Sequence, residues 1–115
     1  MGIFGKIFKS RSLPKSPQEW IAVHFELSSE FGSAEERAMV HKFTDKLASV
    51  INERQAGVFD GDEFGSGHGA LFMYGPDADE LFDVVYASLS TWEPLKGGYA
   101  IKRYGMQGRE QRIEF

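Results

Sequence analysis

The sequence predicts an α+β domain of the ferredoxin-like type, in which two helices cover one face of a mostly antiparallel sheet and an extra strand follows at the C-terminus. Strand-like and helix-like segments follow one another in the order β-α-β-β-α-β-β, and each expected helix begins with an N-cap signal. The chain has 115 residues, which suit one domain. We therefore expect one domain over residues 18–115, preceded by a separate segment over residues 1–17.

The first nine residues have the pattern of a short amphipathic helix. Lysines flank one apolar face, which consists of Ile3, Phe4, Ile7 and Phe8. Such a helix could contact a membrane surface or a partner, but two turns of helix anchor weakly. We therefore favour a segment that folds back onto the domain or is frayed. The following residues to position 17 include two prolines and are typical of a linker. We expect neither a transmembrane helix nor a secretory signal.

The first half of the domain contains one strand and the most strongly marked helix. Apolar side chains alternate with other side chains along residues 20–27, which predicts a half-buried strand. The face expected toward the core carries Ile21, Val23, Phe25 and Leu27. The opposite face carries Trp20, Ala22, His24 and Glu26. Ser33 and Glu36 then form a capping box, which predicts a helix start. Apolar residues continue at helical spacing until Gly57, so we expect a helix of five to six turns.

The second half predicts a hairpin, a second helix and two further strands. Residues 58–64 and 69–74 are strand-like and are joined by a turn with Gly65, Gly67 and Gly69. Asp77 and Glu80 signal a helix start, and Pro94 ends that helix. Residues 99–104 and 109–115 complete the sheet. With both helices on one face, the other face is left to water, a second subunit or a ligand.

Charge and cysteine content limit the functions that the chain can have. Without cysteines there is no disulfide framework, thiolate metal site or cysteine nucleophile, and we expect a cytoplasmic protein. The net charge of −4 argues against a general nucleic-acid binder, which needs a basic face. Phe72 and Tyr74 could stack on RNA bases, but no basic residue precedes Gly69 and the neighbouring acids would repel phosphate, so we expect no RNA binding.

No motif in the sequence predicts catalysis, a metal site or a cofactor. Residues 60–69 begin like a calcium loop, but Phe64 and Leu71 occupy positions that require oxygen ligands. The three histidines, His24, His41 and His68, have no metal-binding spacing, so a zinc site would require the fold to bring them together. An acid–base pair of His24 with Glu26 is less favoured than a solvated pair. We expect His68 to lie in the hairpin turn.

Part of the sequence resembles small uncharacterised bacterial proteins. The shared pattern includes Gly57-Val58-Phe59-Asp60-Gly61-Asp62-Glu63-Phe64-Gly65, then Leu71-Phe72-Met73-Tyr74-Gly75-Pro76-Asp77-Ala78-Asp79, and finally Arg103-Tyr104-Gly105. This resemblance implies a ferredoxin-like fold and brings no activity, ligand or site residue with it. A fainter similarity, limited to Phe59-Asp60-Gly61, connects the chain to ribonuclease E-inhibiting regulators and suggests a protein-binding regulator.

The preferred interpretation is a non-enzymatic interaction or regulatory protein, such as an immunity-type protein or an inhibitor. Asp60, Asp62 and Glu63 would steer association with a basic partner. The residues expected to contact a partner or a second copy on the open sheet are Trp20, His24, Phe72 and Tyr74.

The alternative is a small-molecule or anion-binding domain, or an enzyme, that uses the open sheet face. In this case Arg103 and Arg109 would bind an anion and His24 could move a proton. One concave cluster of these side chains would favour the alternative.

Overall fold

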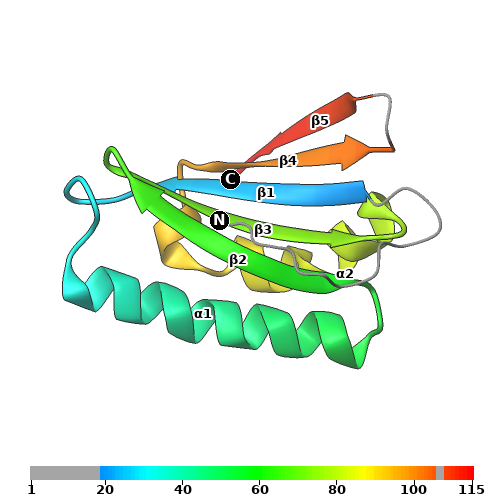
Figure 1. The fold of residues 1–115 in the computed structure, drawn as a ribbon, viewed down its shortest axis with the longest axis horizontal. Coiled ribbons are helices and arrows are strands. Elements are labelled where there is room, and N and C mark those ends of the chain that lie inside the picture. Colours follow the sequence, from blue (N-terminus) through cyan, green and yellow to red (C-terminus); the bar gives the residue numbers. More distant parts are fainter. Residues whose placement is uncertain (1–18, 106–107) are drawn as a thin grey trace, which may run out of the picture.

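The computed structural model describes residues 19–105 and 108–115 of the chain (Figure 1). The predicted amphipathic segment and linker, residues 1–17, lie outside the described residues. The elements in chain order are β1 (Glu19–Glu26), α1 (Ala34–Glu53), β2 (Val58–Gly65), β3 (His68–Gly75), α2 (Ala78–Ser90), a 3-10 helix (Glu93–Leu95), β4 (Tyr99–Tyr104) and β5 (Arg109–Glu114).

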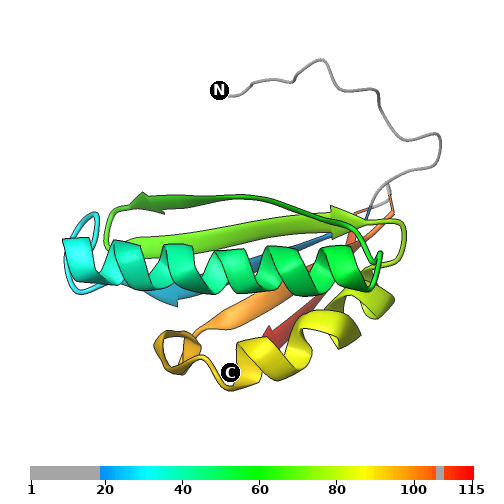
Figure 2. The same ribbon diagram turned by 90° about the horizontal axis from the view of Figure 1, so that it is seen from below.

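The five strands form one sheet in the order β2-β3-β1-β4-β5, and every neighbouring pair is antiparallel. Helices α1 and α2 lie on the same face of this sheet (Figure 2). The predicted ferredoxin-like fold with an extra C-terminal strand is therefore confirmed. Within the described residues, no helix has the length and apolar character that a membrane span requires.

The capping box predicted at the start of α1 is present. The Ser33 hydroxyl accepts the Glu36 amide at 3.0 Å, and the Glu36 carboxylate accepts the Ser33 amide at 2.8 Å. The Ser28 hydroxyl also donates to Glu36 at 2.7 Å. The hydrogen bond from the Ser28 side chain makes the largest contribution to lowering the pKa of the Glu36 carboxyl group. The hydrogen bond from the Ser33 amide lowers it further. The cap thus fixes both the helix start and the loop that leads into it.

The core lies between the sheet and the two helices. Its buried apolar side chains come from β1, α1, β3, α2 and β4 and include Ile21, Val23, Phe25, Val40, Leu47, Leu71, Met73, Leu81, Val85, Leu89 and Ala100. Trp92, just beyond α2, stacks on Phe43 with ring centroids 4.1 Å apart and contacts Phe25 edge-on at 5.1 Å. This aromatic cluster joins β1, α1 and the end of α2.

The β2–β3 hairpin is tighter than the glycine pattern predicts. Ser66 and Gly67 alone form the turn, with φ values of 57° and 74°, which are typical of a two-residue hairpin. Strand β3 therefore begins at His68, and the prediction that His68 lies in the turn is wrong. The turn is tied to the β1–α1 loop, because the Leu27 amide donates to the Gly67 carbonyl at 2.9 Å and the Gly67 amide donates to the Glu30 carbonyl at 2.8 Å.

A bulge interrupts the pairing of β2 with β3. The register shifts between Phe59 and Gly61, so Asp60 is the extra residue. After the bulge, Asp62 pairs with Leu71, whose side chain is in the core, and Glu63 pairs with Ala70. The bulge therefore sets which acidic side chain of β2 faces the helices and which faces away from them.

Replacement of Gly75 at the end of β3 is expected to destabilise the fold strongly. A Cβ at Gly75 would lie 2.2 Å from the backbone oxygen of Ala56, and no side-chain rotation relieves such an overlap. We expect Gly75→Ala to lower the free energy of unfolding by about 1–3 kcal/mol in chemical denaturation. Gly65→Ala is the control, since its Cβ would meet only a ring atom of Phe31 at 3.9 Å. Equal stability of the two variants would contradict this prediction.

Candidate functional site on the open face of the sheet

The face of the sheet opposite the helices, here called the open face, is built by the register of β1 with its two neighbours. Residues directly opposite in antiparallel strands share a face. Across β3, β1 and β4 the open face therefore has three rows, which are Tyr74-Trp20-Arg103, Phe72-Ala22-Ile101 and Ala70-His24-Tyr99. Four of the predicted contact residues, Trp20, His24, Phe72 and Tyr74, thus lie together on this face.

The most specific contact on the open face joins two histidines that are 44 residues apart in the sequence. His24 Nδ1, on β1, lies 2.8 Å from His68 Nε2, on β3. A hydrogen bond at this distance holds one hydrogen between the two nitrogens, so one ring donates and the other accepts. The fold therefore brings His24 and His68 together, which the spacing of the histidines in the sequence could not predict.

His24 belongs to a stack that continues across β4 to β5. The Tyr99 ring stacks on His24 with centroids 4.8 Å apart, and the Arg112 guanidinium lies 3.7 Å from the Tyr99 centroid. Partial burial, followed by the charges of His68 and Arg112, lowers the pKa of His24, while the charge of Glu63 opposes this shift. These effects favour the neutral form of the His24 imidazole.

A second aromatic–cation contact lies at the other end of the open face. The Arg103 guanidinium lies 5.4 Å from the Trp20 ring centroid. Its Nε is also 3.7 Å from a carboxylate oxygen of Glu110 on β5. Arg103 is thus held over the sheet by both an aromatic ring and an acid.

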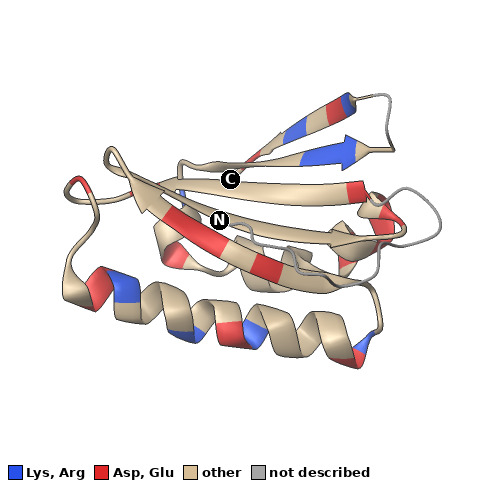
Figure 3. Cartoon of the chain, viewed as in Figure 1, with Lys and Arg blue, Asp and Glu red and all other residues tan. Residues whose placement is uncertain are grey.

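The three acids predicted to steer association with a basic partner do not share one face of the sheet. Figure 3 shows acidic residues along β2 at one edge of the sheet, and basic residues on β4 and β5, with acids among them on β5, at the other. Asp62 faces α1, where its carboxylate lies 3.8 Å from Nε2 of His41. Asp60 is exposed at the bulge, and Glu63 is exposed on the open face opposite Ala70. Only Glu63 therefore shares the open face with the histidine pair.

A cavity of about 410 Å³ lies beside the histidine pair, at the hairpin end of the open face. It is lined by Glu63, Phe64, Gly65, Ser66, His68 and Ala70. The cavity thus places a carboxylate and an imidazole on the walls of one hollow.

The two arginines predicted to bind an anion are not brought together. Arg103 is on the open face, whereas Arg109 pairs with Tyr104 at the next register position, which faces the helices. The Arg109 guanidinium lies 4.4 Å from the Tyr104 ring centroid. The structure therefore forms no anion site from this pair.

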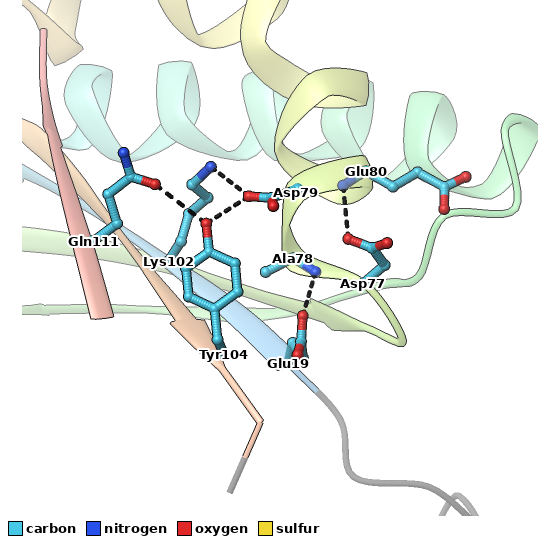
Figure 4. Close-up of polar contacts among 8 residues, drawn as sticks. All are labelled: Glu19, Asp77, Ala78, Asp79, Glu80, Lys102, Tyr104 and Gln111. Carbon is cyan, nitrogen blue, oxygen red and sulfur yellow. Dashed lines mark hydrogen bonds and ion pairs between the residues drawn. The ribbon is translucent and has the colours of Figure 1, made fainter. Parts of the chain in front are cut away.

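A separate polar cluster holds the N-terminal end of α2 to the sheet on the helix side (Figure 4). The buried Lys102 ammonium donates to Asp79 at 2.7 Å, and the Tyr104 hydroxyl donates to the same oxygen. Burial opposes the charge of Lys102, but the hydrogen bonds to Asp79 and Tyr104 outweigh it and raise the pKa of Lys102. Glu19 of β1 accepts the Ala78 amide at 2.8 Å. This cluster is a structural clasp between α2, β1 and β4.

In residues 19–105 and 108–115, no three histidine, aspartate or glutamate side chains are gathered as metal ligands. No family model matches the chain, and neither a curated protein nor a solved structure matches it significantly. The resemblance to small bacterial proteins and to ribonuclease E-inhibiting regulators therefore stays a prediction. The geometry of the open face is the evidence from which a function can be argued.

The clasp on α2 is expected to respond asymmetrically to removal of its two charges. Asp79→Ala leaves the buried Lys102 ammonium without its carboxylate and should destabilise the protein. Lys102→Met keeps an unbranched apolar side chain at this buried position, where Lys102 Nζ lies 4.8 Å from the Phe82 ring centroid. It leaves an exposed carboxylate that water can solvate, so it should destabilise less. Asp83→Ala, one turn further along α2, is the control. Thermal unfolding at pH 7 measures the three variants, and a larger loss for Lys102→Met would contradict the assignment.

The clasp also predicts a pH dependence. Hydrogen bonds from Lys102 and Tyr104 lower the pKa of Asp79 below its ordinary value of 3.8. A carboxylate with a lowered pKa stabilises the folded state above the ordinary pKa, and this contribution is lost as the pH falls below it. Wild type should therefore lose more stability than Asp79→Asn between pH 5 and pH 2.5. Parallel stability curves would show that the ionised Asp79 contributes nothing.

Proposed function

We propose that the chain is a cytoplasmic, non-enzymatic protein-interaction module that binds its partner with the open face of the sheet. The observation that carries this proposal is the row arrangement on that face, which presents partly exposed aromatic side chains between arginines and acids. The aromatic members are Trp20, Phe72, Tyr74 and Tyr99. Aromatic residues and arginine are the types enriched at protein interfaces.

Rigid aromatic side chains suit this role because they bury a large area at a low cost in conformational entropy. Two of the rings are already held by neighbours, since Trp20 lies under Arg103 and Tyr99 lies between His24 and Arg112. A partner would therefore meet a largely preorganised surface. Asp60 and Glu63 on the edge strand would raise the association rate with a basic partner and contribute less to its affinity.

The alternative, an anion-binding domain or enzyme, gains no support from the placement of its residues. Arg103 and Arg109 lie on opposite faces of the sheet. Arg103 is also paired with Glu110, so its charge is partly offset. A second copy of the chain is a partner of the kind proposed here, and it would use the same face.

The proposal predicts that truncation of open-face aromatics abolishes partner capture while folding survives. The full chain, immobilised in wild-type form or as Trp20→Ala or Phe72→Ala, is exposed to nuclease-treated lysate of the source cells. The matched control is Tyr86→Ala, which removes an aromatic side chain that is 48% exposed on α2. We expect the same protein to be retained by wild type and Tyr86→Ala, and its affinity to fall at least about tenfold for each open-face variant.

Two results would contradict the proposal. One is a captured protein that binds all four forms equally, and the other is the absence of any captured protein together with a monomer in sedimentation experiments. For a captured partner, Glu63→Gln should slow association and reduce its salt dependence. Glu53→Gln, at the end of α1, is the control for loss of one negative charge.

A further inference from the structure

We propose that His24 and His68, with Glu63 as a third ligand, form a binding site on the open face for a divalent transition-metal ion of the Zn²⁺ or Cu²⁺ type. This site is independent of the proposed partner. It rests on the convergence of two imidazole nitrogens from different strands, on the position of Glu63 beside them, and on the cavity that Glu63 and His68 line.

The two histidine nitrogens already occupy nearly the separation that one metal ion requires. His24 Nδ1 and His68 Nε2 are 2.8 Å apart. Zinc binds imidazole nitrogen at about 2.0–2.1 Å, so two nitrogens on a tetrahedral ion lie roughly 3.3 Å apart. Small rotations of two partly exposed rings would supply this difference. The hydrogen that now lies between the nitrogens moves to the other nitrogen of its own ring, so both ligands remain neutral.

The register of three strands places Glu63 next to this pair. Glu63 on β2 and His24 on β1 are the direct neighbours of Ala70 on β3, one on each side. His68 lies two residues before Ala70 on the same face. Three ligating side chains therefore surround a methyl group, which is too small to separate them. In the structure the exposed Glu63 carboxylate does not yet complete a three-ligand group with the histidines. The proposal therefore requires a change of the Glu63 rotamer to bring its carboxylate to them.

The cavity of about 410 Å³ provides the approach and the remaining coordination positions. Glu63, His68 and Ala70 all contribute to its lining. A metal ion held there by three protein groups would keep at least one position for water or for a side chain of a partner. An ion at this position would thus be accessible from the open face.

The donor set determines the class of metal. Two imidazole nitrogens and one carboxylate suit Zn²⁺, Cu²⁺ and related ions, whereas Ca²⁺ and Mg²⁺ require more oxygen ligands. The nearby positive charge of Arg112 opposes a cation, but Arg112 is itself paired with Glu114. We therefore expect selective binding of transition metals and no binding of Ca²⁺ or Mg²⁺.

The third histidine provides a matched control within the same chain. His41 is exposed on α1 and is 3.8 Å from Asp62, on the other side of the sheet. Isothermal titration of the full chain with Zn²⁺ and with Cu²⁺ should detect one site per chain. We expect His24→Ala and His68→Ala each to weaken binding at least about tenfold, Glu63→Gln to weaken it less, and His41→Ala to leave it unchanged.

A measurement on the wild-type protein guards against variants that do not fold. Nitrogen-15 resonances of the imidazoles of His24 and His68 should shift on addition of one equivalent of Zn²⁺, while those of His41 should not. Ca²⁺ should leave all three unchanged. Absence of binding, binding that depends on His41 to the same extent, or shifts confined to His41 would overturn the proposal. None of these results would bear on partner capture by the open face.

Discussion

The backbone pairing of β1 with both β3 and β4 is the constraint on which the rest of the structure depends. This central strand has partners along both sides, so its register determines which residues are buried. Ile21, Val23 and Phe25 face the helices because of this register. A shift of one residue would move them to solvent and would bury a tryptophan and a histidine instead. The same pairing therefore builds the core and orders the open face.

Much of this architecture could be predicted from local patterns. The capping box at Ser33, the alternation in β1 and the turn signals each act over a few residues, and the structure confirms the elements that they predict. Their agreement with one another is what made the fold class predictable. The grouping of Trp20, His24, Phe72 and Tyr74 on one face followed from the same alternation.

The features that could not be predicted depend on single residues in the backbone. The two-residue turn at Ser66 and Gly67 moved His68 from a loop into a strand. The bulge at Asp60 sent Asp62 toward α1 while Glu63 stayed on the open face. The register of β4 with β5 places Arg109 opposite Tyr104 and so separates it from Arg103. A shift of one residue along a strand reverses the face of a side chain, and composition or spacing does not reveal such a shift.

The hydrogen bonds between the β2–β3 turn and the β1–α1 loop have a consequence for the surface that they border. Leu27, three residues after His24, donates to Gly67, which immediately precedes His68. The two imidazoles thus belong to strands whose ends are fastened together, and their spacing is set when the chain folds. Ordering them requires no further loss of backbone freedom when a ligand or a protein arrives. The conformational entropy cost of bringing His24 and His68 together is therefore part of the cost of folding and is not part of the cost of binding.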